Sequence, residues 1–250
     1  MALPEDLHGE GNRGQVEEAP GASRIGVVKA TIRLLTFRIT AEELAALDGR
    51  HLAFGAVCTW IVGMGRFWDD PNAVPYLRAG LGSLGYILGL TLVLRFSLDP
   101  LNPKPGSLRR LLTFVALTSP PGILYAIPVE LWTSPEAARS LNLAFLLAVA
   151  SWRLGLALVL LPRLTGLGWA QVMSAVMLPI CAAIVILSVT NCLDQVFEFM
   201  GGFRKLSPEE LARNRLWSGI GWSSCTAGLF FAILYVSCLM RRVGTDRQSS

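Results

Sequence analysis

Charged residues are scarce in this chain. Only 16% of its 250 residues are Asp, Glu, Lys or Arg, whereas about 25% of a typical soluble domain is charged. Apolar residues make up 52%, and the mean hydropathy is +0.49. So few charges cannot cover the surface of a soluble protein of this size. The composition therefore predicts an integral membrane protein whose main solvent is lipid.

Histidine is nearly absent, and the cysteines show no ligand spacing. There are two histidines, His8 and His51, and none of the five cysteines forms a C-x-x-C pair. A histidine-based triad, a metal site and a disulfide framework therefore lack support, and we expect no cofactor. The chain also has no G-x-S-x-G, Walker or H-E-x-x-H motif. No motif points to a reaction, so the sequence argues against an enzyme.

The net charge of +4 is small, and no cluster of Lys and Arg is interleaved with aromatic residues. Nucleic acid is therefore not an expected partner. The first 24 residues contain no apolar core of a secretory signal peptide, so an internal span must direct insertion. Residues 1–23 are predicted to form a disordered polar tail.

Apolar runs long enough to cross a bilayer, roughly 17–25 residues each, recur along the rest of the chain. They predict an all-α polytopic bundle over residues 51–240, with short loops. The first run, HLAFGAVCTWIVGMGRF, is short, so five spans are the alternative to six. The predicted spans are about 51–67, 74–96, 110–131, 141–161, 168–190 and 216–240.

The flanking segments are predicted to be cytoplasmic. Thr40 and Glu43 fit a capping box, so a short helix is expected at 41–48 within a juxtamembrane segment, residues 24–50. Residues 241–250 form a basic, polar C-terminal tail. Lys and Arg near the span ends are more numerous on the side that would face the cytoplasm if the N-terminus is inside. Both termini are therefore expected in the cytoplasm.

Arg153 lies within the apolar run LLAVASWRLGLALVLL, residues 146–161. A central Arg costs roughly 2.5–3.5 kcal/mol on insertion scales, and such residues usually face the protein interior. None of the predicted spans has a carboxylate in its interior. Pro120, Pro121 and Pro179 lie at a similar depth, and a proline in a span leaves a backbone carbonyl without its N–H partner.

Arg153 is therefore predicted to bind the freed carbonyls of Ala116, Leu117 and Ala175 and to tie three spans together. Two alternatives stay open. Arg153 could extend toward the 161 end of its helix, or it could bind an anion or a lipid headgroup directly. The candidate polar layer comprises Arg153, Ser119, Pro120, Pro121, Pro179, Ser151, Gln171 and Ser174.

Three carboxylates lie at the predicted outer face. Asp69 and Asp70 are adjacent in the stretch GRFWDDP, and Glu130 ends the stretch YAIPVE. The pair is able in principle to bind a cation, and Glu130 to act as a general acid. The simpler interpretation of all three is a solvated turn or helix end. In the second span, Gly85 and Gly89 are spaced for close helix packing.

Three stretches resemble a group of uncharacterised bacterial multi-pass inner-membrane proteins that is similar in outline to Yip1-domain proteins. They are AFGAVCTWIVGMGRFWDDP (53–71), LLTFVALTSPPGILYAIPVELW (111–132) and LLAVASWRLGLALVLL (146–161). The shared outline is a polar cytoplasmic N-terminal segment followed by five or six closely spaced spans. The resemblance implies a protein of the bacterial inner membrane that acts through partners or membrane organisation, and it assigns no functional residue.

Three functions follow as alternatives. The leading one is a non-enzymatic membrane component that works through lipids, a membrane-protein partner or a homo-oligomer. The second is a small-solute or ion transporter built around the polar layer in spans three to five. The third is a lipid-modifying enzyme that uses the outer-face carboxylates.

Overall fold

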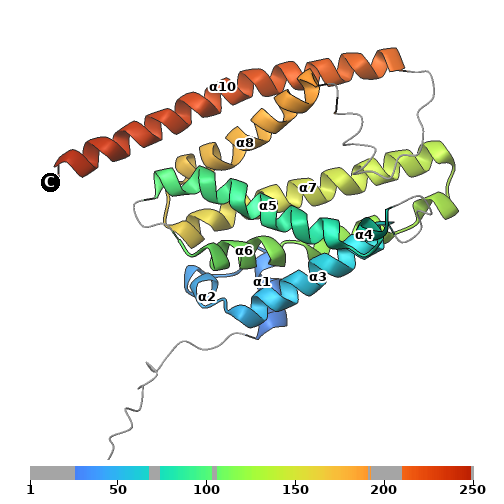
Figure 1. Ribbon diagram of the computed structural model, residues 1–250, viewed down its shortest axis with the longest axis horizontal. Coiled ribbons are helices and arrows are strands. Elements are labelled where there is room, and N and C mark those ends of the chain that lie inside the picture. Colours follow the sequence, from blue (N-terminus) through green and yellow to red (C-terminus); the bar gives the residue numbers. More distant parts are fainter. Residues whose placement is uncertain (1–25, 68–73, 103–105, 191, 193–209, 249–250) are drawn as a thin grey trace, which may run out of the picture.

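The computed structural model describes residues 26–67, 74–102, 106–190, 192 and 210–248, and every regular element in these ranges is helical. The longer helices run back and forth along roughly one common direction (Figure 1). The elements in chain order are α1 (Val27–Leu35), α2 (Ala41–Ala45), α3 (Gly49–Phe67), α4 (Pro75–Arg78), α5 (Leu81–Leu98), η1 (Asp99–Leu101), α6 (Leu108–Leu117), η2 (Pro120–Ala126), η3 (Val129–Leu131), α7 (Pro135–Thr165), α8 (Trp169–Val189) and α10 (Glu210–Gln248).

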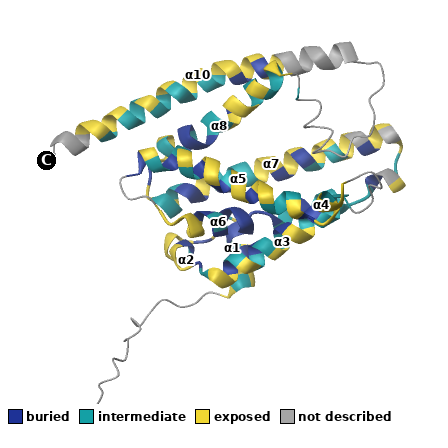
Figure 2. Ribbon diagram, viewed as in Figure 1, coloured by how far each residue is buried: buried dark blue, intermediate teal, exposed yellow. Residues whose placement is uncertain are grey.

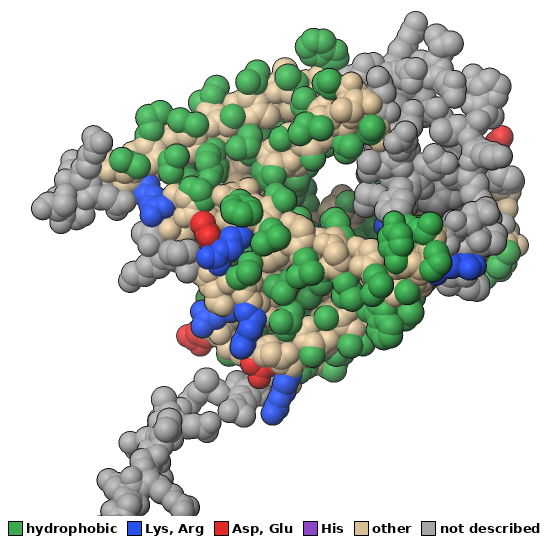
Figure 3. Space-filling model, viewed as in Figure 1, with side chains coloured by type: hydrophobic (Ala, Val, Ile, Leu, Met, Phe, Trp, Pro, Cys, Tyr) green, Lys and Arg blue, Asp and Glu red, His purple; other side chains and the backbone are tan. Residues whose placement is uncertain are grey.

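The all-α prediction is confirmed, and four helices are long and apolar enough to cross a membrane. The qualifying segments are Leu81–Leu101, Glu136–Thr165, Trp169–Val189 and Gly219–Gly244. They correspond to the second, fourth, fifth and sixth predicted spans. Their outer faces carry large apolar side chains, such as Phe96 and Trp222, which are each 75% exposed. Apolar side chains also cover most of the described surface in the space-filling view (Figure 3), as expected for a surface solvated by lipid.

The bundle has two distinct ends. At one end the start of α6 and the ends of α5 and α7 meet around Arg95, Arg110 and Thr165. The C-terminal part of α10 joins the same end, because Arg242 donates to the backbone carbonyls of Asp99 and Pro100. We call this the basic end. At the opposite end, α3 finishes at Phe67 and α5 begins at Leu81.

The first predicted span is α3, which is not among the four membrane-length apolar helices. Its 19 residues include four glycines, and the second residue and the next-to-last residue are both Arg. The buried side of α3 is a stripe with a four-residue spacing: His51, Gly55, Thr59 and Gly63. A Cβ at Gly55 would lie 2.8 Å from the Cβ of Ala116, and one at Gly63 would lie 2.8 Å from the Gly80 carbonyl oxygen. These small residues let α3 approach α5 and α6 closely.

The third predicted span is broken. The α-helix α6 stops at Leu117, and the chain continues as the 3₁₀ segments η2 and η3. Pro120 and Pro121 have no N–H to continue the helical ladder. The N–H of Ser119 instead bonds the carbonyl of Ala116 at 3.1 Å, and the N–H of Thr118 bonds that of Val115. The prediction that proline leaves the Ala116 carbonyl free is therefore wrong, because a tight turn satisfies it.

The N-terminal segment belongs to the same core as the bundle. Thr40 and Glu43 form the predicted capping box, although α2 ends at Ala45 and not at residue 48. Ile39 and Leu44 are completely buried, and α1 and α2 lie along the flank of the bundle beside α3 and α6 (Figures 1 and 2). Arg163 of α7 donates to the carbonyls of Phe37, at 3.3 Å, and Ile39, at 2.9 Å.

Helices α8 and α10 pack along each other as a pair. A Cβ at Gly221 would lie 3.0 Å from the Cβ of Ser188, so their approach depends on glycine. Among the described side chains, those that join the pair to the main core lie in its half at the basic end: Leu167, Val172, Ala175 and Val176 before or in α8 and Tyr235, Cys238 and Leu239 in α10. In Figure 3 an opening separates the other half of the pair from the rest of the bundle.

The glycine spacing in the second span does not pack within the chain. A Cβ at Gly85 or Gly89 would meet no atom within 4 Å. Close helix contacts are made instead by glycines of α3 and η2.

Candidate functional site: an arginine–tyrosine cluster and a basic cavity

Arg153 faces the break between α6 and η2. Its Nε donates to Thr118 Oγ1 at 3.3 Å, and its guanidinium carbon lies 5.4 Å from the ring centroid of Tyr86. The Nη2 nitrogen is buried, and no hydrogen-bond partner for it lies in the part of the chain that the structure describes. An unsatisfied buried donor costs about 1–3 kcal/mol, and more when it is charged. Arg153 is thus only partly satisfied by the protein.

A second arginine and a second tyrosine lie close to this position. The guanidinium carbon of Arg66, near the end of α3, is 5.5 Å from the ring centroid of Tyr125 in η2. The Tyr125 hydroxyl is within electrostatic reach of Arg66, Arg153 and Tyr86. We call Arg66, Tyr86, Tyr125 and Arg153 the Arg–Tyr cluster. Four separate elements contribute to it, so it is created by the fold and not by any local stretch of sequence.

Two members of the cluster, Arg66 and Tyr86, lie closer to the opposite end of the bundle than to the basic end. Arg66 is the next-to-last residue of α3. At 1.5 Å per residue, Tyr86 is about 7 Å from the start of α5 and about 18 Å from its end. Arg153 is about 18 Å from the basic end of α7 and about 27 Å from its start, so the 161 end is the nearer end of its own helix, as predicted.

Two hydroxyls pair beside the cluster. Thr59 Oγ1 and Ser119 Oγ are hydrogen-bonded at 2.8 Å, and both residues are buried. Thr59 also lies 2.8 Å from the Gly55 carbonyl oxygen. This polar contact joins α3 to the turn that ends α6. The predicted polar-layer residue Ser119 is therefore buried against Thr59 and not against Arg153.

The other members of the predicted layer lie elsewhere. Ser151 is exposed, and Ser174 is buried against the carbonyl of Gln171. Gln171 caps the start of α8 by accepting from the Gly168 N–H at 2.8 Å. Pro179 lies inside an uninterrupted α8. Because the hydrogen bond recorded for Arg153 goes to a hydroxyl of the α6 turn, the predicted carbonyl tie among three spans is not what the described residues form.

The predicted outer-face carboxylates are not among the side chains that the structure describes. Asp69 and Asp70 lie outside the described residues, as does the side chain of Glu130. Among the residues that were described, no group of three His, Cys, Asp or Glu side chains could hold a metal ion.

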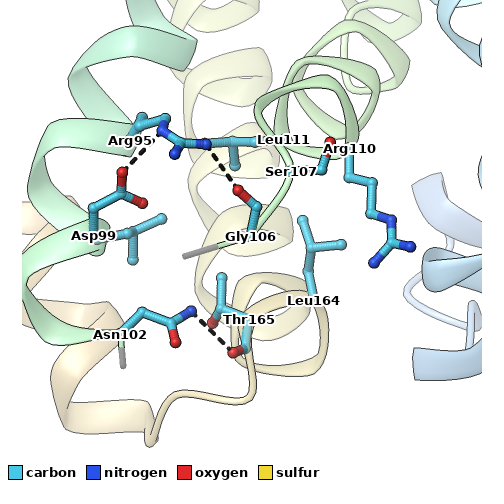
Figure 4. A pocket seen from close by; sticks show the side chains of 10 residues that line it. Arg95, Asp99, Asn102, Gly106, Ser107, Arg110, Leu111, Leu164 and Thr165 are labelled. Atoms are coloured by element: carbon cyan, nitrogen blue, oxygen red, sulfur yellow. Dashed lines mark hydrogen bonds and ion pairs between the residues drawn. The ribbon is translucent and has the colours of Figure 1, made fainter. Parts of the chain in front are cut away.

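A small, open cavity of about 50 Å³ lies at the basic end, between the end of α5, the start of α6 and the end of α7 (Figure 4). Arg95 forms an ion pair with Asp99 at 2.8 Å and donates to the Gly106 carbonyl at 2.8 Å. Asn102 donates to the Thr165 carbonyl at 3.4 Å and closes another side. The Arg110 side chain lines the cavity beyond Ser107 and is exposed. The cavity thus carries two arginines and one carboxylate.

His51 and Asp48 form a separate polar pair at the start of α3. His51 is only 4% exposed, and its Nδ1 is 2.8 Å from Asp48 Oδ1. This hydrogen bond lowers the pKa of the Asp48 carboxyl below its usual value. The pair fixes the first turn of α3, because Asp48 also accepts from the N–H of Arg50 at 2.9 Å.

Sequence reasoning missed Tyr86, Tyr125, Arg66, Thr59 and Thr118. A signal existed for Thr59, which shares the four-residue spacing of Gly55 and Gly63. The two tyrosines had no local signal, because each is one aromatic residue in a glycine-rich or proline-rich apolar run.

The chain matches no known family model, and no curated protein or solved structure is significantly similar to it. The outline shared with Yip1-domain proteins therefore stays a prediction, and the argument for function rests on the chain's own geometry.

Proposed function

We propose that this chain is a non-enzymatic component of the bacterial inner membrane that acts through lipids or protein partners. In this proposal all six antiparallel segments cross the bilayer, with α3 and the broken α6–η2 segment as the two crossings beyond the four long apolar helices. The basic end, with both termini, faces the cytoplasm. The arginines at that end support this orientation, because cytoplasmic flanks carry an excess of Lys and Arg.

One observation carries the proposal: the polar cavity at the basic end lies where the apolar helices finish. Headgroups occupy this level of a bilayer. Arg95 is held by Asp99 and Gly106, whereas Arg110 is exposed at the cavity edge. A positively charged, partly preformed cavity at this depth suits the phosphate of an anionic lipid.

The test compares two neighbouring arginines. Arg110 lines the cavity, whereas Arg109 is also exposed but does not line it. Native mass spectrometry of the full chain, purified in a neutral detergent with added phosphatidylglycerol, should show bound lipid. We expect Arg110→Gln to reduce that binding severalfold and Arg109→Gln to leave it nearly unchanged. Equal loss in both variants would mean that only net charge matters, and a stably bound protein subunit would favour a protein partner instead.

A small-solute or ion transporter is the second candidate. The observation that favours it is the buried Nη2 of Arg153, which has no partner among the described residues. Solute-dependent stabilisation that Arg153→Gln abolishes would support it. The carboxylates that a lipid-modifying enzyme would use, those of Asp69, Asp70 and Glu130, lie outside what the structure describes.

A further inference from the structure

The Arg–Tyr cluster contains donors that the described protein groups do not satisfy. A guanidinium has five N–H donors and no acceptor. Arg153 uses Nε on Thr118 and presents its face to Tyr86, while Nη2 stays buried without a partner in the described ranges. Arg153 also forms no ion pair with any described carboxylate. What the position lacks is an acceptor, and preferably a negatively charged one.

Arg153 lies between two helices that are not packed tightly on each other. Helix α7 packs on η2, η3 and α8, whereas α5 packs on α3, α6 and α8. The side chains of Arg153 and Tyr86 meet between α5 and α7. Tyr86 is 50% exposed and Arg153 is partly exposed, so the edge of the cluster is reachable from outside. Nη2 itself is buried, so an anion reaches it when a neighbouring side chain such as Tyr86 moves aside.

The surrounding chemistry is complementary to an oxyanion. Two guanidinium groups contribute positive charge, and the hydroxyls of Tyr86 and Tyr125 are donors of the kind that phosphate and carboxylate oxygens accept. Arg66 is held over the Phe67 and Tyr125 rings, at 5.4 Å and 5.5 Å, so its position is fixed. The low dielectric of the surroundings strengthens any charge interaction formed there.

We propose that the Arg–Tyr cluster is a binding site for an oxyanion, a phosphate or carboxylate group, that enters from the opposite end of the bundle. Arg153 Nη2 donates to it, Arg66 supplies the second charge, and Tyr86 closes the site from α5. This site is separate from the basic cavity and does not depend on the function proposed for that cavity.

The depth of the cluster allows two sources for the oxyanion. Arg66 is the next-to-last residue of α3, and Tyr86 is about 7 Å inside the start of α5. A lipid phosphate in the leaflet at that end reaches this level when its headgroup sinks slightly, and a free anion reaches it from the aqueous side. Both sources present the same acceptor atoms to Arg153.

The test uses the full chain in a neutral detergent and two probes. The first probe is inorganic phosphate, compared with chloride at equal ionic strength. Binding is measured as an increase in the midpoint temperature of thermal unfolding. The second is phosphatidylglycerol against phosphatidylcholine, read as lipid retained in native mass spectrometry. We expect Arg153→Gln to weaken binding of the active probe by about tenfold to a hundredfold, as for loss of a charged hydrogen bond. Tyr86→Phe should weaken it by about twofold to tenfold.

Two variants serve as matched controls. Arg78→Gln removes an exposed positive charge at the same end without touching the cluster, and Arg110→Gln removes the arginine of the basic cavity. Both should retain the binding that Arg153→Gln loses. Phosphate binding identifies a free anion as the source, and binding of phosphatidylglycerol alone identifies a lipid headgroup.

Three results would overturn the proposal. The first is a wild type with no preference for phosphate over chloride or for phosphatidylglycerol over phosphatidylcholine. The second is wild-type binding in Arg153→Gln. The third is a loss of binding in Arg78→Gln as large as that in Arg153→Gln, which would reduce the effect to surface charge. If Arg153→Gln does not fold, Tyr86→Phe serves in its place, because the Tyr86 side chain is half exposed. Unchanged binding in Tyr86→Phe would then contradict the proposed site.

Discussion

At the scale of single residues, glycine makes a close approach of two helices possible. Gly55 faces Ala116 at the end of α6, where an added Cβ would lie 2.8 Å from a side-chain atom and 3.0 Å from a backbone carbon. A backbone atom cannot rotate away, so the two helices would have to separate. Gly89, in contrast, faces no atom within 4 Å.

We therefore expect Gly55→Ala to destabilise the protein by about 1–3 kcal/mol, the usual cost of overpacking. Gly89→Ala should be neutral or slightly stabilising, because alanine is the better helix former. Thermal unfolding of both variants in one detergent provides the measurement. Equal midpoints in the two variants would contradict the packing described for α3.

Asp48 gives a residue-scale prediction that depends on pH. Its pKa is lowered in the folded state by the hydrogen bond with His51. The stabilisation is therefore fully present above the pKa of Asp48 in the unfolded chain, and it is lost as the pH falls through the folded pKa. Asp48→Asn should unfold at a lower temperature than wild type at neutral pH, and the difference should shrink in strong acid. A difference that is constant across the acid range would show that Asp48 acts only as a neutral acceptor.

At the scale of elements, one side chain attaches the α1–α2 segment to α7. Arg163 donates to the Phe37 and Ile39 carbonyls, and Phe37 has a φ of 61°, a left-handed conformation that is unusual for a residue with a side chain. The Phe37 ring packs 5.8 Å from the ring of Trp152. The Arg163 side chain thus holds an unfavourable turn in place.

Arg163→Gln is expected to speed amide hydrogen exchange at residues 36–40 by about tenfold or more, since losing charged hydrogen bonds costs about 1.5–3 kcal/mol. Exchange in α8 should stay the same. Arg38→Gln, at an exposed position in the same turn, is the control. If the amides of residues 36–40 exchange as slowly in Arg163→Gln as in wild type, packing of Phe37 alone would hold the turn.

At this scale, local motifs were predictable from the sequence, whereas contacts between distant segments were not. The capping box of Thr40 and Glu43 was predictable, because the two residues are three positions apart and the motif is local. The partner of Arg153 was not, because the contact with Thr118 depends on how the α6 turn and α7 meet. The prolines at 120 and 121 signalled a break, but whether the chain bends or turns tightly depends on packing against α3.

At the scale of the whole molecule, the six antiparallel crossings that we propose would place the two ends of the bundle on opposite sides of the membrane. Arg78 belongs to one end and Arg109 to the other, and both are exposed. Arg78→Cys and Arg109→Cys, each made in a background without the five native cysteines, should be labelled from opposite sides by a membrane-impermeant thiol reagent. We expect label from outside intact cells at position 78 only. Labelling of both from one side would exclude the proposed topology.

The α8–α10 pair has a mechanical consequence for the molecule. Among the described side chains, the pair joins the common core through Leu167, Val172, Ala175 and Val176 and through Tyr235, Cys238 and Leu239, so the part of the pair beyond these residues can tilt like a lever arm. From Tyr235 to Gly219 the arm is about 24 Å long, so a tilt of about 10° at the joint moves its tip by about 4 Å. That distance is comparable to the thickness differences between natural bilayers. In the proposed topology, the angle between the pair and the bundle would therefore respond to the thickness of the bilayer.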